Sequence, residues 1–549
     1  MVTGAAPARS TGGIDPGSLD PLAVVVTGLG TTNPLGGDLA ATWRALRAGR
    51  CAVRLLDEPW AEEYRLAVRV AAPLARDASR TLTPRERRRL DRASQCALLA
   101  AREAWAHAGS PEVDGQRLSV SVSPGMGLVR SVIDTWETLR GRGPRRVLPT
   151  AVPALMPNAP AAAVGIELGA RGGIHAPVSA CASGAEAISY GADLIALGRA
   201  DVVVAGAIDD ISIESVVGFG NMNATAEAAA MRAKGISDRH FSRANDRRRG
   251  GFVEAEGGGT VILARGSVAA RMGLPVAGVV GFVSSYADGA HTSIPAPGLG
   301  ALGAGRGGRS SRLAKALAAL GVEADDIALV SKHDTSTGAN DPNESELHTR
   351  LARALGRSEG NSLVAVSQKT ITGHAKGGAA VFQVAGLTEI LASGVAPGNA
   401  SLDVVDAPLA KDAFWVWPRR PIRLAGRGGQ DGRVPGAGPV RAGLLTSLGF
   451  GHVSGLIAIV HPGAFEAALR QAEGQEAVDA WLASANARLA AGTRRRRAGM
   501  IGRAPLFEQV QGRRLGEESK QRDPHEVEAA MLLDPEARLG SDGVYHAGE

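Results

Sequence analysis

The sequence predicts an α/β fold built from two similar halves. Short apolar runs with the length of buried strands alternate with helical runs from about residue 23 to residue 462. Glycine accounts for 72 of the 549 residues and aromatic residues for only 4%, which is typical of tightly packed α/β proteins with many turns. In each half, a strand ends in a turn that carries a chemically reactive side chain. This alternation of strands and helices favours parallel strands with helices on both faces of the sheet, and its recurrence in both halves indicates an internal duplication.

The chain divides into four predicted segments. Residues 1–20 are small and polar with several Gly and Pro, so we expect a flexible lead-in. Residues 21–260 form the N-terminal half and residues 261–462 the C-terminal half. Residues 463–549 form an extension, in which one helix over 466–489 precedes an arginine run and a polar tail.

The elements of each half follow from apolar periodicity and from Gly and Pro at the ends of each run. The pattern predicts strands at 23–30, 118–122, 201–206, 260–264, 327–330, 363–367 and 443–447, helices at 90–107, 310–320 and 377–392, and a surface loop at 424–439. A further helix opens at Met156–Pro160. Residues 219–259 are a long polar and Gly-rich passage that apolar residues punctuate regularly, so we expect it to be ordered and functional.

Charge and composition limit the possible partners. The net charge is +6, and arginines cluster at 85–89, 247–249 and 494–497. Solvated faces are the default interpretation of such clusters, and an acidic protein partner is the functional alternative. The scarcity of aromatic residues and the lack of a recognition motif disfavour nucleic acid.

Three cysteines, Cys51, Cys96 and Cys181, cannot build a disulfide framework and show no metal-ligand spacing. A reducing compartment follows from this. The N-terminus has no secretory signal pattern, and no run approaches the roughly 20 apolar residues of a membrane span. We therefore predict a cytoplasmic protein with no membrane contact.

The stretch Ala176–Ile188 is the centre of the predicted site. It has the pattern of an extended segment that delivers Cys181 to the first turn of a helix. Unpaired N–H groups and the helix dipole at such a position favour the thiolate, which is the nucleophilic form. A lone Cys among Ala and Ser is more often a small buried side chain. Two downstream histidine-bearing stretches change that balance.

The first of these stretches, residues 331–344, follows a predicted strand and is crowded with small polar residues. Its position is the carboxyl end of a strand, where α/β proteins place their sites. His333 alone would be interpreted as a structural histidine. For Asp341 and Glu344 we favour helix capping and a local salt bridge.

The second stretch, residues 368–379, also follows a strand and enters an Ala/Gly-rich helix. It carries Lys369 and His374 across a glycine turn, and a lysine directly after a buried strand is rarely idle. Further along, Gly449, Phe450 and Gly451 follow an apolar strand. This last turn is either a plain connection or a site of backbone N–H donors with a mobile aromatic ring.

Together these residue types suit one reaction class. A thiolate can accept an acyl group, backbone N–H groups can hold the developing oxyanion, and neutral imidazoles can stabilise an enolate. Transfer of an acyl group to Cys followed by carbon–carbon bond formation would use all of them. That chemistry requires no metal and no organic cofactor, so we predict neither.

The motifs resemble, in order, those of the β-ketoacyl-acyl carrier protein synthases. The matching motifs are Ala180-Cys181-Ala-Ser-Gly, His333-x-Thr335-x-Thr337 with Asp341 and Glu344, Lys369-x-x-Thr-Gly-His374, and Gly449-Phe450-Gly451. The resemblance covers about residues 23–462. It implies a thiolase-like fold, which is a duplicated five-layered αβαβα architecture.

The resemblance also implies a role for each motif. Cys181 would be the acyl-accepting nucleophile, His333 and His374 the decarboxylation and condensation pair, and Lys369 their support. Backbone N–H groups of Cys181 and Phe450 would form the oxyanion hole, with Phe450 as a gate. The implied partners are an acyl carrier protein that bears acyl and malonyl groups and a second copy of the chain in a homodimer.

Within that family the two-histidine pattern resembles the elongating branch. The first part of the chain is similar to free-standing synthases, and the part from Phe241 onward is similar to the synthase region of bacterial type I fatty acid synthases. Asp334 and Lys376 depart from the free-standing pattern of Gly and an apolar residue. We predict an elongating 3-oxoacyl-carrier-protein synthase of fatty acid synthesis. The alternatives are a polyketide-type ketosynthase and a non-catalytic chain-length-factor-like partner, against which Cys181 argues.

Overall fold

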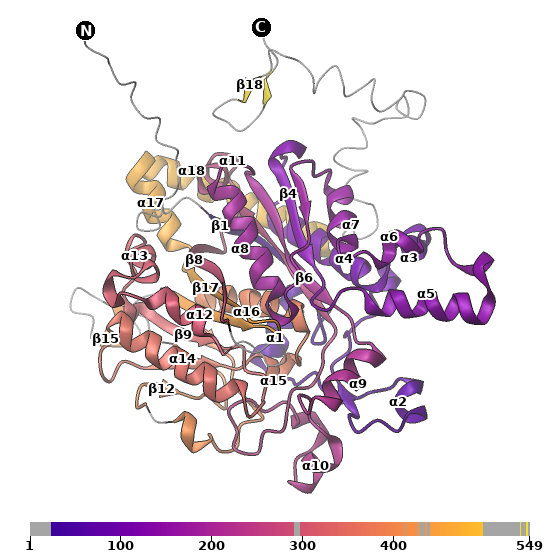
Figure 1. The fold of residues 1–549 in the computed structure, drawn as a ribbon. Coiled ribbons are helices and arrows are strands. Elements are labelled where there is room, and N and C mark those ends of the chain that lie inside the picture. Colours follow the sequence, from indigo (N-terminus) through magenta and orange to yellow (C-terminus); the bar gives the residue numbers. More distant parts are fainter. Residues whose placement is uncertain are drawn as a thin grey trace, which may run out of the picture.

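A computed structural model describes residues 24–289, 297–410, 412–424 and 440–497, together with four two-residue strands at 427–428, 434–435, 538–539 and 545–546. The predicted lead-in, most of the 424–439 loop and most of the tail after residue 497 lie outside the described residues. Within them, strands and helices alternate along the chain as the sequence predicts (Figure 1).

Ten principal strands form two sets of five, one in each half. The first set is β1 Val25–Thr32, β4 Leu118–Ser123, β5 Gly173–His175, β6 Val202–Asp209 and β7 Gly257–Ala264. The second set is β8 Gly278–Ala287, β9 Ile327–Ser331, β10 Leu363–Val366, β16 Ala442–Leu448 and β17 Val453–Val460.

The two sets have the same topology. The spatial order is β5-β4-β6-β7-β1 in the first and β10-β9-β16-β17-β8 in the second, with β12 (Trp415–Val416) outside β10. In each set the first three strands are parallel and the last two join antiparallel. This repetition confirms the predicted duplication. The two sets join where β1 pairs with β8 through Val25 and Val279, which makes one eleven-stranded sheet.

The expectation of parallel pairing is therefore wrong for two strands of each set. β7 runs antiparallel to β6 because no single crossover helix joins them. The chain leaves β6 at its C-terminal end, passes through residues 210–256 and enters β7 beside that same end. In the second half, the short turn at 449–452 joins β16 to β17 as a hairpin.

Two helices form the central layer. α8 (Ser183–Ala196) contacts β4 and β6 of the first set and β8 and β17 of the second, and α16 (Ala379–Ser393) contacts β7 as well as β16 and β17. The side chains of α16 are mainly apolar around its whole circumference, as expected of a helix packed between two sheets. Val381, Leu387 and Ile390 are each at most 1% exposed, and burial of each stabilises the fold by about 1.5–3 kcal/mol.

The outer layers complete the five-layered arrangement. α4 (Arg92–His107) and α7 (Ala159–Leu168) cover the first set, and α13 (Arg312–Ala318) and α14 (Asn340–Leu355) lie over the second. The other helices are α1 Leu39–Arg47, α2 Pro59–Glu63, α3 Pro84–Arg89, α5 Val129–Arg142, α6 Ala151–Leu155, α9 Ile213–Asn221, α10 Ala228–Ala233, α11 Gly266–Met272, α12 Leu299–Leu302 and α15 Lys369–Thr372. Short strand pairs lie at β2 Arg54–Leu55 with β3 Val70–Ala71, β11 Val395–Ala396 with β13 Ile422–Arg423, β14 Arg427–Gly428 with β15 Val434–Pro435, and β18 Arg538–Leu539 with β19 Tyr545–His546.

Two predicted boundaries need correction. The division at 260/261 cuts through β7, which belongs to the first set, so the join between the halves lies after α11. The single helix predicted over 466–489 is two helices, α17 (Gly463–Glu473) and α18 (Gln475–Arg497), because Gly474 takes a φ of +91° between them.

The start of the extension packs against the body of the molecule. The Trp481 indole N–H donates to the carbonyl of Leu274 at 2.8 Å, and its ring lies 5.0 Å from that of Phe465. The guanidinium of Arg488 donates to the carbonyl of Gly109 at the end of α4. In the described part of the chain, no helix combines the length and the apolarity needed to cross a bilayer.

Candidate active site

Cys181 lies where the sequence places it, between β5 and α8. Residues 180–182 form a short 3₁₀ turn, in which Ala180 has a φ of +49°. The hydroxyl of Ser183 accepts the N–H of Ser179 and donates to the carbonyl of Ala180, so it closes the turn from within. The Ser447 hydroxyl donates to the carbonyl of Cys181 at 2.7 Å, which ties the turn to β16.

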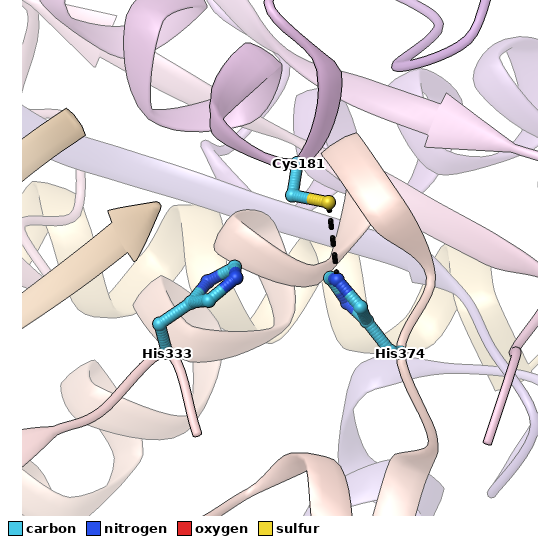
Figure 2. Close-up of side chains that lie close together, drawn as sticks. All are labelled: Cys181, His333 and His374. Carbon is cyan, nitrogen blue, oxygen red and sulfur yellow. Dashed lines mark hydrogen bonds between the residues drawn. The ribbon is translucent and has the colours of Figure 1, made fainter. Parts of the chain in front are cut away.

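The helix start does not by itself ionise the thiol. Cys181 is 5% exposed, and burial raises the pKa of its thiol to about 12, against the opposing fields of Lys369 and Lys376. The expectation that the turn alone favours the thiolate is therefore wrong for the resting protein. A base must take the proton, and the Nε2 atom of His374 lies 3.2 Å from the sulfur (Figure 2).

His333 and His374 face the thiol together. Their ring centroids are 5.2 Å apart with the planes at 90°, and both side chains point toward the sulfur (Figure 2). Burial and the positive charge of Lys369 hold the pKa of each imidazole well below its usual value. Both rings are thus neutral near pH 7, as the sequence predicts. Neither Nε2 of His333 nor Nδ1 of His374 has a hydrogen-bond partner among the described residues.

Lys369 lies behind His333. Its ammonium is 3.3 Å from the Nδ1 atom of His333, it donates to the carbonyl of the same residue, and it lies 3.4 Å from the amide oxygen of Gln383. Burial lowers the pKa of Lys369 to about 8. A donor at Nδ1 makes that nitrogen the acceptor, so the proton of the neutral His333 ring sits on Nε2.

His374 is placed by backbone hydrogen bonds. Its N–H donates to the carbonyl of Val253 and its carbonyl accepts from Ala255, both at close to strand geometry. Gly373 turns the chain into this position with a φ of +72°, and a Cβ there would lie 2.9 Å from that of Ala255. The glycine before His374 is thus a requirement of the backbone.

Glu344 and Asp341 are not helix caps, so the capping part of the favoured interpretation is wrong; Asp341 does form an ion pair, at 3.7 Å, but with Arg249, which is distant in sequence. Both are fully buried in the first turns of α14. The carboxylate of Glu344 accepts the N–H groups of His333 and Asp334, and that of Asp341 accepts the N–H of Asn245. Buried N–H groups of an irregular loop need such acceptors, which a cap would not provide.

Thr335 and Thr337 lie on the same loop, with their hydroxyls 3.0 Å apart. The hydroxyl of Thr337 accepts the N–H of Asn340, the first residue of α14. The side chain that satisfies the helix start is therefore Thr337, whereas the sequence analysis assigned capping to the acids that follow it.

The turn at Phe450 approaches the turn at Cys181. A Cβ on Gly449 would lie 2.6 Å from the carbonyl oxygen of Ser179, so only glycine allows the two turns to pack. The N–H of Gly449 donates to the carbonyl of Val453, and Gly451 has a φ of +80°. The N–H groups of Cys181 and Phe450 as oxyanion donors remain a prediction.

A row of aromatic rings connects Phe450 to His374. Phe450 stacks on Phe219 at 6.0 Å between centroids, Phe219 meets Phe252 at 5.2 Å, and Phe252 meets His374 at 5.0 Å. The sequence analysis did not identify Phe219 or Phe252 as site residues. The available signal was their occurrence in the polar 219–259 passage of a chain with few aromatics.

Two buried lysines next to the histidines were also missed as site features. Lys332 pairs with Asp334 at 2.7 Å, and Lys376 pairs with Glu254 at 3.0 Å. All four are at most 2% exposed. Their one sequence signal was the departure of Asp334 and Lys376 from the resembling family.

One cluster of metal-ligand types occurs in the described residues: Cys181, His333 and His374, whose ligand atoms lie within 4.8 Å of one another. Thiolate and imidazole are ligands that zinc accepts. The prediction that the protein holds no metal stays a prediction, which elemental analysis of the purified protein would test.

Family models match both halves of the chain. The model for "Beta-ketoacyl synthase, N-terminal domain" matches residues 22–269, and the model for the C-terminal domain of the same family matches residues 276–403. The solved structure of a beta-ketoacyl synthase from Burkholderia phymatum STM815 superposes with a TM-score of 0.66 over 80% of this chain and 99% of that one. At 24% identity, that structure shows the fold, and it agrees with the predicted five-layered architecture.

Both free-standing and multifunctional proteins are similar in sequence. The 3-oxoacyl-[acyl-carrier-protein] synthase 2 of Mycobacterium leprae is 34% identical over 72% of this chain and 90% of its own length. Fatty acid synthase 2 of Mycosarcoma maydis is 33% identical over 69% of this chain, which spans only 10% of that protein. The fatty acid synthase alpha subunit stcJ of Emericella nidulans is 36% identical over 58% of this chain and 20% of its own length.

Proposed function

The chain belongs to the β-ketoacyl synthase family, and from this premise we propose that it condenses an acyl chain held on Cys181 with a malonyl group on an acyl carrier protein. The reaction releases carbon dioxide and lengthens the chain as a 3-oxoacyl thioester. The observation that carries the proposal is a buried nucleophile in contact with one neutral imidazole, that of His374, with a second neutral imidazole, that of His333, packed against the first.

Acyl loading uses Cys181 and His374. The Nε2 atom of His374 takes the thiol proton as the sulfur attacks the thioester carbonyl, because the buried thiol does not ionise alone. The N–H groups of Cys181 and Phe450 stabilise the oxyanion of the tetrahedral intermediate. The intermediate then collapses, and the proton passes from His374 to the departing carrier thiolate. Phe450 opens and closes the entrance.

Decarboxylation of the malonyl group uses both histidines. The Nε2–H of His333 has no hydrogen-bond partner in the described part of the chain, and it donates to the malonyl thioester oxygen on which enolate charge develops. Once Cys181 is acylated, the Nε2 atom of His374 is released from the thiol, and with the single proton of the neutral ring moved from Nδ1 to Nε2 it donates a hydrogen bond to the same oxygen. The bond to the malonyl carboxylate breaks and carbon dioxide leaves. The enolate carbon attacks the acyl carbonyl on Cys181, and the Cys181 thiolate leaves.

Of the possible functions, we favour a synthase that elongates fatty acids, because the two-histidine pattern supports it. A polyketide-type ketosynthase would use the same site, and it differs in the acyl chain accepted. A non-catalytic, chain-length-factor-like subunit would have no use for a thiol in contact with an imidazole.

Intact-protein mass spectrometry after mixing with acyl-carrier thioesters of several chain lengths tests the proposal. We expect an acyl adduct on the wild type and none on Cys181→Ala. A ranking that favours straight saturated chains supports fatty acid elongation, and a preference for 3-oxo or branched chains supports the polyketide alternative. No adduct from any carrier contradicts the catalytic assignment.

A homodimer is proposed through the β5 edge of the sheet. β5 pairs only with β4 among the described strands, and Ile166 and Val178 beside it are 70% and 45% exposed. The nearby α5 has no buried residue although it carries Val132 and Trp136, and Figure 1 shows it extending away from the body. Exposed apolar side chains around an open strand edge favour association.

Sedimentation velocity tests the proposed dimer. We expect a dimeric wild type and a Val178→Glu variant that dissociates at micromolar concentration. A matched change at Leu55, which is 60% exposed on the distant β2, leaves the dimer intact. A monomeric wild type contradicts the proposal.

Carrier docking is proposed at the exposed arginines of α3, residues 85 and 87–89. The 247–249 cluster is not available for this role, because Arg248 and Arg249 pair with Asp403 and Asp406 of the same chain. We expect Arg87→Glu with Arg88→Glu to raise the KM for the carrier about 10-fold at low salt, with less effect at high salt. An unchanged KM at both salt concentrations contradicts the assignment.

A further inference from the structure

The residues on both sides of His333 are buried ions in contact with each other. Lys332 and Asp334 are each 0% exposed, and the ammonium nitrogen lies 2.7 Å from a carboxylate oxygen. The side chain of His333, between them in sequence, points toward Cys181 (Figure 2). The ion pair therefore closes a small loop of chain around the backbone of the histidine.

The ion pair is also the centre of a larger network. The amide of Asn245 bridges it, because its oxygen accepts from Lys332 at 2.8 Å and its nitrogen donates to Asp334 at 2.8 Å. Lys332 donates to the hydroxyl of Ser345 on α14 and lies 5.1 Å from the ring of Trp417, and Asp334 accepts from Ser367 at the end of β10. The network thus joins four separate segments at the point where β9 ends.

The backbone at Asp334 is in an unusual conformation. Its φ is +40°, in the left-handed region that a residue with a side chain adopts only where its surroundings hold it. The ion pair and the two hydrogen bonds to Asp334 provide that hold. Removal of the charge on either partner would free the loop to relax.

A stabilising role alone does not account for the pair. Well-packed apolar side chains of similar volume often serve stability as well as a buried ion pair does. What the ion pair adds is a defined geometry, in a loop whose two N–H groups at 333 and 334 are also bound by Glu344. Among the described residues the imidazole has one side-chain hydrogen-bond partner, the ammonium of Lys369, so the backbone largely decides where its Nε2 points.

We propose that Lys332 and Asp334 are a pair of positioning residues that fix the imidazole of His333 for malonyl decarboxylation. The pair acts on this half-reaction and not on acyl loading, because His374, on a separate loop, contacts the thiol. The inference rests on the role proposed above for His333.

The test compares two half-reactions in the same preparations. Acyl loading is measured as the adduct on Cys181 by intact-protein mass spectrometry, and decarboxylation as the conversion of a malonyl carrier thioester to its acetyl form. The variants are Lys332→Met and Asp334→Asn, which remove charge at nearly constant size, and the double variant. Asp201→Asn is the matched control, because it removes a carboxylate from the buried pair with Arg117, which lies at the starts of β4 and β6, whereas the site loops follow the ends of their strands.

We expect each single variant to slow decarboxylation about 10- to 100-fold, as small misplacements of reacting groups do, while loading changes less than about 2-fold. The double variant should recover at least about 3-fold relative to the slower single variant, because it leaves no unpaired buried charge. Asp201→Asn should lower the melting temperature and leave the ratio of the two rates unchanged.

An unchanged ratio of decarboxylation to loading in both single variants overturns the inference. A proportional fall in both rates, matching the loss of folded protein by circular dichroism, also overturns it and makes the pair a structural one. If Lys332→Met does not fold, Lys332→Arg replaces it, because it keeps the charge but not the compact ammonium. The ratio of decarboxylation to loading is then measured in that variant, and an unchanged ratio overturns the inference. Full decarboxylation by His333→Ala would instead contradict the proposed role of His333, whatever the ion-pair variants do.

Discussion

The loops that carry His333 and His374 are alike in their surroundings and different in what they face. Each follows one of two adjacent parallel strands, β9 and β10, and each histidine is 1% exposed with a lowered pKa. Each has a buried lysine within two residues, paired with a buried carboxylate. The hydrogen-bond partner of the His333 ring is nevertheless a cation, whereas that of the His374 ring is the thiol. The neighbour across the site, and not the local environment, therefore separates their roles.

The two loops also differ in how their backbones are held. Main-chain hydrogen bonds to residues 253–255 hold His374, whereas the carboxylate of Glu344 holds His333. A backbone partner is kept by every substitution except proline, whereas a carboxylate is lost in most substitutions. The position of His333 is consequently the one that single side-chain changes can disturb.

The largest effect is expected when the Cys181 thiol, the partner that distinguishes His374 from His333, is removed. Cys181→Ala should abolish loading and reduce condensation at least about 10³-fold, because the nucleophile is lost. Mass spectrometry and a radiolabelled condensation assay measure both. Cys51→Ala is the control, since Cys51 lies outside the site with its sulfur against the carbonyl of Arg239, and it should load normally. An acyl adduct on Cys181→Ala would contradict the assignment of Cys181 as the nucleophile.

Alanine at each histidine should separate the roles. We expect His333→Ala and His374→Ala each to slow malonyl decarboxylation about 10²- to 10⁴-fold. His374→Ala should also slow loading about 10-fold, with a rate that rises with pH, because the thiol of raised pKa must then ionise without its base. His333→Ala should load at the wild-type rate. The same loading rate and the same pH dependence in both variants would contradict the different roles proposed for the two histidines.

The acidic supports test how the two loops are held. Glu344→Gln should lower the free energy of unfolding by about 1–3 kcal/mol, because an amide has one acceptor oxygen for N–H groups that now use two. Decarboxylation should fall about 10-fold with it. Glu254→Gln, next to His374, should change decarboxylation less than about 3-fold, since main-chain bonds hold that loop. Urea denaturation and the decarboxylation assay are the measurements, and equal activity losses would contradict this account.

The smallest effect is a pH dependence. Burial lowers the pKa of Lys369 to about 8, so the lysine beside His333 is charged below that pH and neutral above it. Decarboxylation should decline several-fold as the pH rises through about 8, while loading does not decline. A Lys369→Met variant should be slow and lack this limb.

The same shift has a consequence for stability. A folded-state pKa below the unfolded value means that the unfolded state binds more protons between about pH 8 and the ordinary value of 10.5. The penalty of the buried charge is therefore fully present below pH 8 and disappears as the pH rises across that window. Urea titrations of wild type and Lys369→Met at pH 7.5 and 9.5 should show a smaller difference at the higher pH. A larger difference would contradict the direction of the shift.

The secondary-structure elements and the candidate site residues of this protein could be predicted from the sequence because both are encoded in patterns a few residues long. Apolar runs of strand length and the glycines that follow them predicted β4, β6, β9, β10 and β16. The motifs predicted Cys181 at the start of a helix, and His333, Lys369 and His374 on the loops that follow β9 and β10. The alternation predicted the duplication, which the matching strand orders confirm.

Only the tertiary structure decided what those residues experience. The direction of β7, the burial that keeps the Cys181 thiol protonated, and the bonds from Asn245 to a loop 89 residues away all depend on segments distant in sequence. Asp341 and Glu344 show the limit most clearly. Their place at a helix start predicted caps, but packing buried both, with Glu344 against the N–H groups of the His333 loop and Asp341 against the N–H of Asn245. Local pattern selects conformation, whereas desolvation and hydrogen-bond partners are set by the atoms that folding brings together.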